Sequence, residues 1–480
     1  MKPGIVLARL NQLRLPSWRV SVVLLLAFFG FGLLLGNAAG SRVDYTAAAS
    51  RGPVKLVLPA ASPATSDATG EAEAEAEVPP AAEEPTPEAA TPEATPNAPA
   101  AAPKQGGTTQ AGGGGAQDKG GNSGATHGAA ATKLPAIKHV FVIMLSDEPY
   151  ASVFGPESSA HYLAHTLEKR GELLARYYAI AHQQLPNGIA LLSGQGPTPA
   201  TAANCPTYSD LTPASAAGEG QVLGEGCVYP ATVATLPGQL EVKHQTWRAY
   251  VQGIDEAGGP AACAHPALGQ PDPAAASPPS AQAYATFRNP FAYFHSLIDS
   301  PTCAQQDVGL AALDADLASA KRTPSLSYIV PDRCHDGSPG PCPGGGAGGL
   351  PAADGLLQQL VPKILASPAY KHGGLLVITV DEAPSSGEFA DSSSCCGQPS
   401  FPNLPAAAGA PALGPEGGGQ VGALLLSPFV KGGVITQEQY DHFSLLRTIE
   451  DLFGLKHLGY AGAAKAKSLA PSLFLAKPSG

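Results

Sequence analysis

Two low-complexity tracts, residues 71–97 and 105–133, limit how this chain can be organised. The first consists mainly of Ala, Glu, Pro and Thr with almost no large apolar residue, and the second is rich in Gly. Neither tract can bury enough apolar surface to offset the chain entropy that is lost on folding. We therefore predict that residues 41–133 form a disordered stalk, and that the folded domain spans residues 134–480 of the 480-residue chain.

The first 40 residues have the pattern of an export signal. Four basic residues and no acidic residue precede an apolar run over residues 20–35. Positive charges keep such an end in the cytoplasm, and residues 20–39 are just long enough to span a bilayer. We favour an uncleaved anchor over cleavage near the small residues 38–40. The prediction is a single-pass protein of the cell membrane, tethered to the cytoplasmic membrane by its N-terminal segment, with an extracytoplasmic domain.

The distribution of charge argues against one class of partner. The net charge is −11 at pH 7, of which residues 1–40 contribute +4 and residues 41–133 contribute −5, leaving −10 for residues 134–480. An acidic domain is poorly suited to hold a polyanionic backbone. We therefore expect no nucleic-acid partner.

The eight cysteines all follow residue 200. In an exported domain an even number of cysteines indicates disulfide bonds, although the spacing alone does not give the pairing. Cys334 and Cys342 flank a loop rich in Gly and Pro, and a bond between them would close it. Cys395 and Cys396 are adjacent, so we expect each of them to bond elsewhere rather than to each other.

Apolar runs alternate with amphipathic segments in the folded part. A run of apolar residues bounded by polar ones is typical of a strand buried on both faces of a sheet, and alternation with helices indicates an α/β fold. We predict a mainly parallel sheet sandwiched by helices, with a loop-rich insertion at about 205–323. The predicted strands are residues 139–145, 326–330, 375–380 and 421–426, and the predicted helices are residues 161–178, 354–366 and 443–453.

Acidic residues follow several of these predicted strands. In a parallel sheet, ligands bind outside the carboxyl ends of the strands, and closely packed carboxylates require a cation. Each single acid is better explained as a helix cap or a solvated loop residue, so the prediction of a divalent-metal site depends on their recurrence. The candidate ligands are Asp147, Asp336, Asp381, Glu382 and His442.

Several motifs follow one another along the folded part. They are LPNGIALLSG at 185–194, YIVPDRCHD at 328–336, VPKILASPAY at 361–370 leading into VDE at 380–382, VGALLLSPFV at 421–430 and DHFSLLRTIEDLFG at 441–454. Together these motifs resemble the bacterial phosphoesterase family of acid phosphatases and phospholipases C, part of the alkaline-phosphatase-like superfamily. The similarity extends from residue 134 to about residue 465.

The resemblance implies an alkaline-phosphatase-like fold and hydrolysis of phosphate mono- or diesters with a divalent metal ion. By this resemblance Asp381 and Glu382 match the metal-binding pair of the family. Asp336 matches an acid after a motif strand, and His442 matches a late histidine that faces the site. The family attacks phosphorus with a Ser or Thr hydroxyl.

Four positions depart from the family pattern. Gln184 stands where the family has its hydroxyl nucleophile, and Ser146-Asp147 replace the usual Glu-Asn. Ser338 stands in place of a His, and Ala151 in place of a carboxylate or carboxamide. An amide cannot form a phosphoryl intermediate, although a metal-activated water could replace the nucleophile. Two hypotheses follow: an active surface phosphoesterase, or a catalytically degenerate relative that binds a phosphate ester or an envelope ligand.

Overall fold

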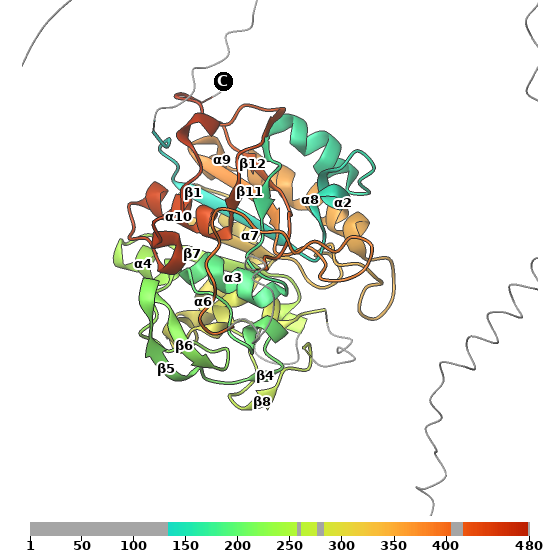
Figure 1. Cartoon of the computed structure of the whole chain (residues 1–480). Helices are drawn as coiled ribbons and strands as arrows, with labels where there is room; N and C mark the ends of the chain where they lie inside the picture. Colours follow the sequence, from blue (N-terminus) through green and yellow to red (C-terminus); the bar gives the residue numbers. More distant parts are fainter. Residues whose placement is uncertain (1–132, 257–260, 276–282, 405–415, 479–480) are drawn as a thin grey trace, which may run out of the picture. The chain divides into compact units, whose positions relative to one another are not determined.

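The computed structural model describes residues 133–256, 261–275, 283–404 and 416–478 (Figure 1). The predicted anchor at 1–40 and the predicted stalk, apart from Lys133, lie outside the described residues. None of the helices in the described ranges is long and apolar enough to cross a membrane.

A mainly parallel sheet forms the centre of the described domain, which confirms the predicted fold class. Its eight strands lie in the order β13-β2-β12-β11-β1-β10-β7-β9. The five strands from β11 to β9 are parallel neighbours, whereas β12 pairs antiparallel with both β11 and β2. The strands are β1 (His139–Leu145), β2 (Glu172–Leu174), β7 (Trp247–Val251), β9 (Asp307–Gly309), β10 (Leu326–Val330), β11 (Gly374–Val380), β12 (Ala423–Leu426) and β13 (Val434–Thr436).

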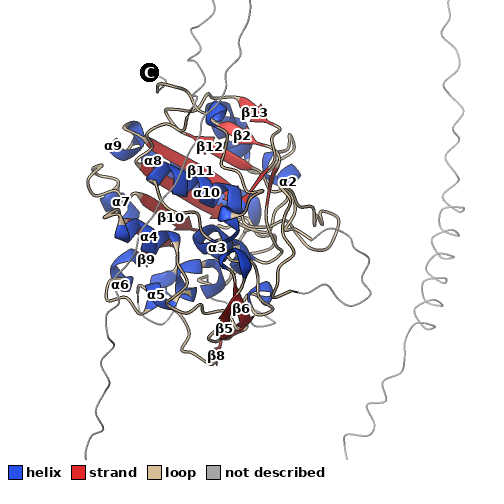
Figure 2. Cartoon of the chain, turned by 60° about the vertical axis from the view of Figure 1, so that its left-hand side comes forward, coloured by secondary structure: helices blue, strands red, loops and turns tan. Residues whose placement is uncertain are grey.

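Helices pack around this sheet (Figure 2). All residues of β11, and all of β1 after His139, are buried, so both faces of the central strands are covered. The α-helices are α2 (Tyr150–Phe154), α3 (Gln184–Ser193), α4 (Leu236–Val242), α5 (His295–Ile298), α6 (Cys303–Gln306), α7 (Ala312–Asp316), α8 (Gly349–Ala366), α9 (Pro368–Lys371) and α10 (His442–Phe453).

Three small two-stranded sheets accompany the central one. Their strands are β3 (Tyr177–Tyr178) with β14 (Tyr440–Asp441), β4 (Thr207–Tyr208) with β8 (Gln270–Pro271), and β5 (Thr212–Ala216) with β6 (Val222–Glu225).

The segment 205–323 corrects the predicted insertion. It contains β4 to β9 and several short helices, but β7 pairs with β10 and β9 pairs with β7 inside the central sheet. Part of this segment is therefore integral to the core. The strand signal of β7 is weak in the sequence because Arg248 interrupts it. The guanidinium of Arg248 reaches Asp316 of α7, with 2.5 Å between Nη1 and Oδ2.

The predicted helix over residues 161–178 is shorter in the structure. A π-helical turn spans Tyr162–Leu167 and a 3-10 turn spans Glu168–Arg170, after which the chain enters β2. The change occurs at Gly171, where an added Cβ would lie 2.4 Å from the carbonyl oxygen of Leu425. Glycine thus permits the close approach that starts the pairing of β2 with β12.

All eight cysteines form disulfides, and no cysteine is free. The bond Cys334–Cys342 is confirmed. The prediction for Cys395 and Cys396 was wrong, because these adjacent residues are bonded to each other. The other six cysteines pair among themselves, which leaves neither residue another partner. The remaining bonds are Cys205–Cys227 and Cys263–Cys303.

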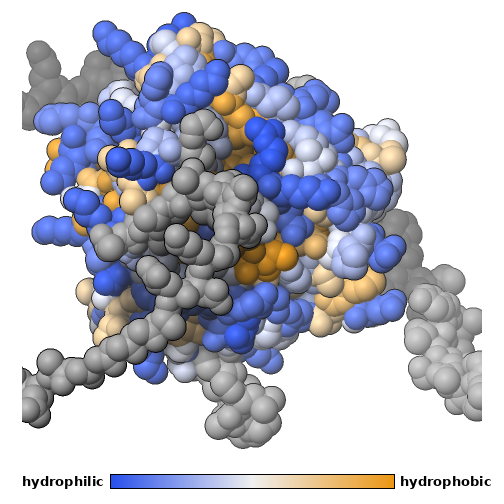
Figure 3. Space-filling view, turned by 90° about the horizontal axis from the view of Figure 1, so that it is seen from above, coloured by the Kyte–Doolittle hydropathy of each residue, from blue (hydrophilic) through white to orange (hydrophobic). Residues whose placement is uncertain are grey.

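Most large apolar side chains of the described residues are buried. Figure 3 shows one face of the molecule, on which hydrophilic residues predominate and hydrophobic patches are separate. The exposed large apolar residues are Val242, Leu268, Phe389, Leu404 and Ile435.

We expect Ile378→Ala to reduce the free energy of unfolding by about 2–5 kcal/mol, because it leaves a cavity in a packed core. Ile378 is fully buried in β11, between Ile143 and Leu424 on the neighbouring strands. Denaturant titration measures the loss. The control Ile435→Ala removes a side chain that is 50% exposed and should change stability by less than about 0.5 kcal/mol. Equal losses in the two variants would contradict the assigned burial.

Candidate active site

The carboxyl ends of β1, β10 and β11 meet at one edge of the sheet, and this register brings the predicted acids together. Leu145, the last residue of β1, pairs with Val380, the last residue of β11. Immediately after the strands, the backbone N–H of Ser146 donates to the carbonyl of Asp336 at 2.8 Å. The N–H of Glu148 donates to the carbonyl of Glu382 at 3.1 Å.

Asp336 is held by two donors. Arg288, at the end of a 3-10 turn (Thr286–Arg288), donates from Nη1 to Oδ2 of Asp336 at 2.6 Å. The backbone N–H of Ser338 donates to Oδ1 at 2.7 Å. Both side chains of the ion pair are only 3% exposed. Sequence reasoning missed Arg288, and no motif or strand end in the sequence identifies it.

Three further carboxyl groups lie near this ion pair. Burial raises the pKa of Asp147 to about 6 and that of Asp381 to about 7, and it holds the pKa of Glu382 well above its usual value. Neighbouring carboxylates act in the same direction on each of them, whereas the positive charge of Arg288 lowers all three pKa values. Oδ1 of Asp381 is buried and has no hydrogen-bond partner among the described residues.

The backbone at Asp147 also marks this place. Its φ of 53° lies in the left-handed region, which is unusual for a residue other than glycine. Such conformations cluster at functional sites.

His442 is placed beside the acids, but its ring is fully engaged. Nε2 contacts the carbonyl oxygen of Asp381 at 3.0 Å, and Nδ1 contacts the hydroxyl of Tyr177 at 2.9 Å. Because a carbonyl oxygen only accepts, Nε2 carries the proton and Nδ1 accepts from Tyr177. Complete burial lowers the pKa of His442 to about 4, so the ring is neutral. In this arrangement the imidazole fixes the end of β11 and offers no nitrogen to a metal.

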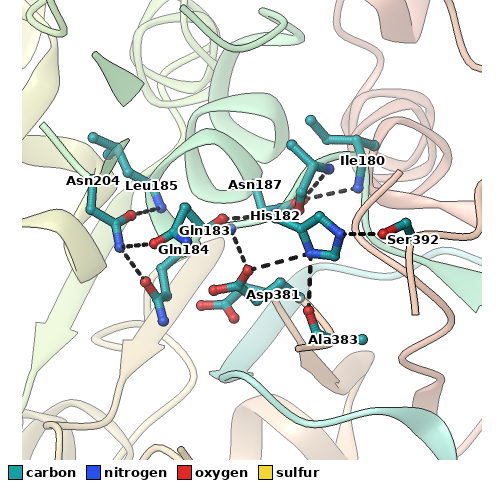
Figure 4. Close-up of polar contacts among 12 residues, drawn as sticks. Ile180, His182, Gln183, Gln184, Leu185, Asn187, Asn204, Asp381, Ala383 and Ser392 are labelled. Carbon is teal, nitrogen blue, oxygen red and sulfur yellow. Dashed lines mark hydrogen bonds and ion pairs between the residues drawn. The ribbon is translucent and has the colours of Figure 1, made fainter. Parts of the chain in front are cut away.

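Gln184 is the first residue of α3, next to the acids (Figure 4). Its side-chain oxygen accepts from Nδ2 of Asn204 at 2.5 Å, and Oδ1 of Asn204 accepts from the backbone N–H of Leu185 at 3.1 Å. The carboxamide is therefore held in place by the residue that satisfies one free N–H group of the helix.

The loop before α3 is fixed by Asn187, a motif residue. Its Oδ1 accepts from the N–H of Ile180 at 2.9 Å, and its Nδ2 donates to the carbonyl of Gln183 at 2.8 Å (Figure 4). The N–H of Gln183 donates in turn to Oε2 of Glu382. These contacts connect the start of α3 to the end of β11.

Gly188 allows α3 to approach the segment that carries Arg288. A Cβ at this position would lie 2.8 Å from Cβ of Pro290. The glycine of the LPNG motif thus places Gln184 and Arg288 on the same cavity.

Two cavities of about 350 and 420 Å³ share Asp147, Gln183 and Gln184 in their walls. The first is also lined by Asn204, Arg288, Arg333, Asp336 and Ser338, and the second by Glu382 and the exposed ring of Phe389. Amide, carboxyl and guanidinium groups therefore converge on an open, polar site at the carboxyl edge of the sheet.

A comparison with known protein families identifies the family to which this architecture belongs. A model of the phosphoesterase family matches residues 156–456, more than half of the chain. The chain belongs to the phosphoesterase family. The family predicted from the sequence motifs is thereby confirmed.

Solved structures similar to this phosphoesterase-family chain are distant in sequence. A protein of the alkaline phosphatase superfamily from Vibrio parahaemolyticus is 12% identical over 72% of this chain and 73% of its own, with a TM-score of 0.41. A putative sulfatase from Bacteroides thetaiotaomicron is 14% identical over 70% and 74%, with a TM-score of 0.39. The lipoteichoic acid synthase LtaP from Listeria monocytogenes is 10% identical over 70% and 76%, also with a TM-score of 0.39. No curated protein matched the chain.

Two of the five residues predicted to bind metal are engaged by other partners in this structure. Asp336 is occupied by Arg288 and Ser338, and His442 has no free nitrogen. Among the described residues, two groups of potential ligands lie within 4.8 Å of one another, and each includes disulfide-bonded cysteines rather than thiolates. Those groups are Asp332, Cys334 and His335, and Cys395, Cys396 and Asp441. The geometry thus does not fit the metal site that the family implies.

Two of the other departures from the family pattern lie at the same site. Ser146 is buried directly after β1, and Ser338 binds Asp336 through its backbone, whereas Ala151 is exposed on α2. None of these three positions supplies a strong metal ligand.

We expect the protein in EDTA to lose stability as the pH rises from about 4 to about 8. The folded state keeps Asp147 and Asp381 protonated to about pH 6 and 7, whereas the unfolded chain releases these protons near pH 4. The folded state therefore binds more protons over this interval, and the free energy of unfolding falls as the pH rises.

The variant Asp381→Asn tests this expectation in thermal unfolding across the same pH range. It removes one buried titrating group and should flatten the pH dependence of Tm. Asp314→Asn is the matched control, because Asp314 lies on the surface and pairs with Lys363 at 2.8 Å. An Asp381→Asn profile parallel to that of the unmodified protein would show that the carboxyl does not titrate as described.

Proposed function

We propose that this phosphoesterase-family protein is a catalytically degenerate member that uses its cavity to bind a phosphate ester or an envelope ligand outside the cytoplasmic membrane. One observation carries the proposal: Gln184, which stands where the family resemblance puts the nucleophile, presents a carboxamide that is hydrogen-bonded to Asn204. An amide has no hydroxyl that a base can activate for attack on phosphorus, so no phosphoenzyme can form on it.

Metal-dependent hydrolysis of phosphate mono- or diesters is the second candidate. The observation in its favour is that the charge of Asp147 raises the pKa values of both Asp381 and Glu382, and the charge of Asp381 raises that of Glu382 as well. A divalent ion would neutralise such a cluster of carboxyl groups. A water molecule bound to that ion would then supply the attacking oxygen.

Turnover of chromogenic phosphate mono- and diesters distinguishes the two candidates. We expect background rates with Mg²⁺, Mn²⁺ or Zn²⁺, and no phosphoenzyme. Gln184→Ser restores a hydroxyl but should not restore activity alone, because the groups around it act as a unit. Restoring the family pattern with Ser146→Glu, Asp147→Asn and Ser338→His in addition is the stricter test.

One result would decide in favour of hydrolysis. Robust turnover by the unmodified protein that is abolished by Asp381→Ala but unchanged by Gln184→Ala would establish hydrolysis by water and defeat the degenerate reading. Gln183→Ala serves as the control, because its side chain also contacts Asn204, at 2.8 Å, but it does not stand at the nucleophile position.

Export of the domain is part of the same proposal. The four basic residues ahead of the apolar run support it, and so do four disulfides, which persist in oxidising compartments. We expect protease added to intact protoplasts to remove residues 134–480 while the first 40 residues stay with the membrane. A fully protected domain would contradict this location.

A further inference from the structure

Arg288 is the charged centre of the site and lies within the protein interior. The residue is 7% exposed, and its Nη1 is 2.6 Å from Oδ2 of Asp336. Its charge also acts on Asp147, Asp381 and Glu382, the other carboxyl groups at this edge of the sheet. One fixed positive charge thus interacts with four neighbouring carboxyl groups.

Burying a guanidinium costs free energy unless a negative charge compensates it. Closely packed carboxylates likewise repel one another unless a positive charge lies beside them. Arg stays charged at every physiological pH, and its planar group donates to carboxylate oxygens in a fixed geometry. Asp336 accepts from Arg288 on one oxygen and from the Ser338 N–H on the other, so a metal ion bound through both oxygens would compete with both donors. A divalent ion placed beside Arg288 would also be repelled by it.

We propose that the Arg288 guanidinium takes the place of the metal ion at this edge of the sheet, so that the unmodified protein holds no divalent ion there. The chain therefore carries the countercharge of the site as one of its own side chains. This deepens the proposed binding function, on which it rests, by naming the cation that organises the cavity.

Thermal unfolding with added metal tests the inference on the full-length protein. After treatment with EDTA and its removal, Mn²⁺ or Zn²⁺ should leave the Tm of the unmodified protein within about one degree. Arg288→Met removes the cation while keeping much of the side-chain volume, and it leaves Asp336 uncompensated. Its Tm should rise by several degrees with Mn²⁺, since a ligand that binds the folded state stabilises it.

Arg248→Met is the matched control. It breaks a similar ion pair, with Asp316, away from the cavity, and should gain no response to metal. Adding Asp336→Asn to Arg288→Met should remove the response again. Stoichiometric metal, measured by elemental analysis, should accompany each rise in Tm.

The result that overturns the inference needs no variant. A rise of several degrees with Mn²⁺ or Zn²⁺ in the unmodified protein, together with one bound equivalent of metal, would show that Arg288 does not exclude the ion. Should Arg288→Met fail to fold, this measurement still decides.

Phosphatase turnover measured in the same samples separates the two proposals. Turnover without bound metal defeats the degenerate function but leaves the role of Arg288 intact, whereas bound metal without turnover defeats only the role of Arg288.

Discussion

The site depends on one constraint: three buried carboxyl groups, those of Asp336, Asp381 and Glu382, gather with the half-buried Asp147 where the parallel strands β1, β10 and β11 end together. The sheet brings them there because parallel neighbours in register finish at the same edge. The repulsion between these carboxyl groups and the loss of their hydration then have to be offset. In this structure the guanidinium of Arg288 supplies part of the offset, and burial raises the pKa values of Asp147, Asp381 and Glu382, which favours their uncharged forms.

The parts of the fold that could be predicted are those with a local signal. The apolar runs at 139–145 and 326–330 are strands β1 and β10 to the residue, because strands buried on both faces have no polar alternation. Strand β7 was missed because Arg248 interrupts its run, and β2 because its three residues follow a helical turn. The pairing of Cys395 with Cys396 was missed because adjacency seemed to argue against it.

Only part of the candidate site could be predicted from the sequence. Strand-end positions gave Asp147, Asp336, Asp381 and Glu382, which the structure brings together. Arg288 had no such signal, because it comes from a short turn in an irregular segment and reaches Asp336 across 48 residues of sequence. The role of His442 was also beyond the sequence, since only the contacts of its two nitrogens distinguish a ligand from a buried structural histidine.

The motifs that identify the family are largely the ones that hold the fold together. Asn187 fixes the loop before α3, and the carboxylate of Asp441 caps α10 by accepting from the N–H and hydroxyl of Ser444. Gly188 permits close packing against Pro290. Changing these residues would cost stability, whereas Gln184 faces a cavity and is satisfied by one hydrogen bond from Asn204. A chain can therefore keep the sequence pattern of phosphoesterases while its cavity changes chemistry. The proposed binding function links the charge balance of the site to the residue at the nucleophile position. In a binding protein without turnover, a metal would have no catalytic role to preserve, and the proposed arginine countercharge would not depend on a supply of ions.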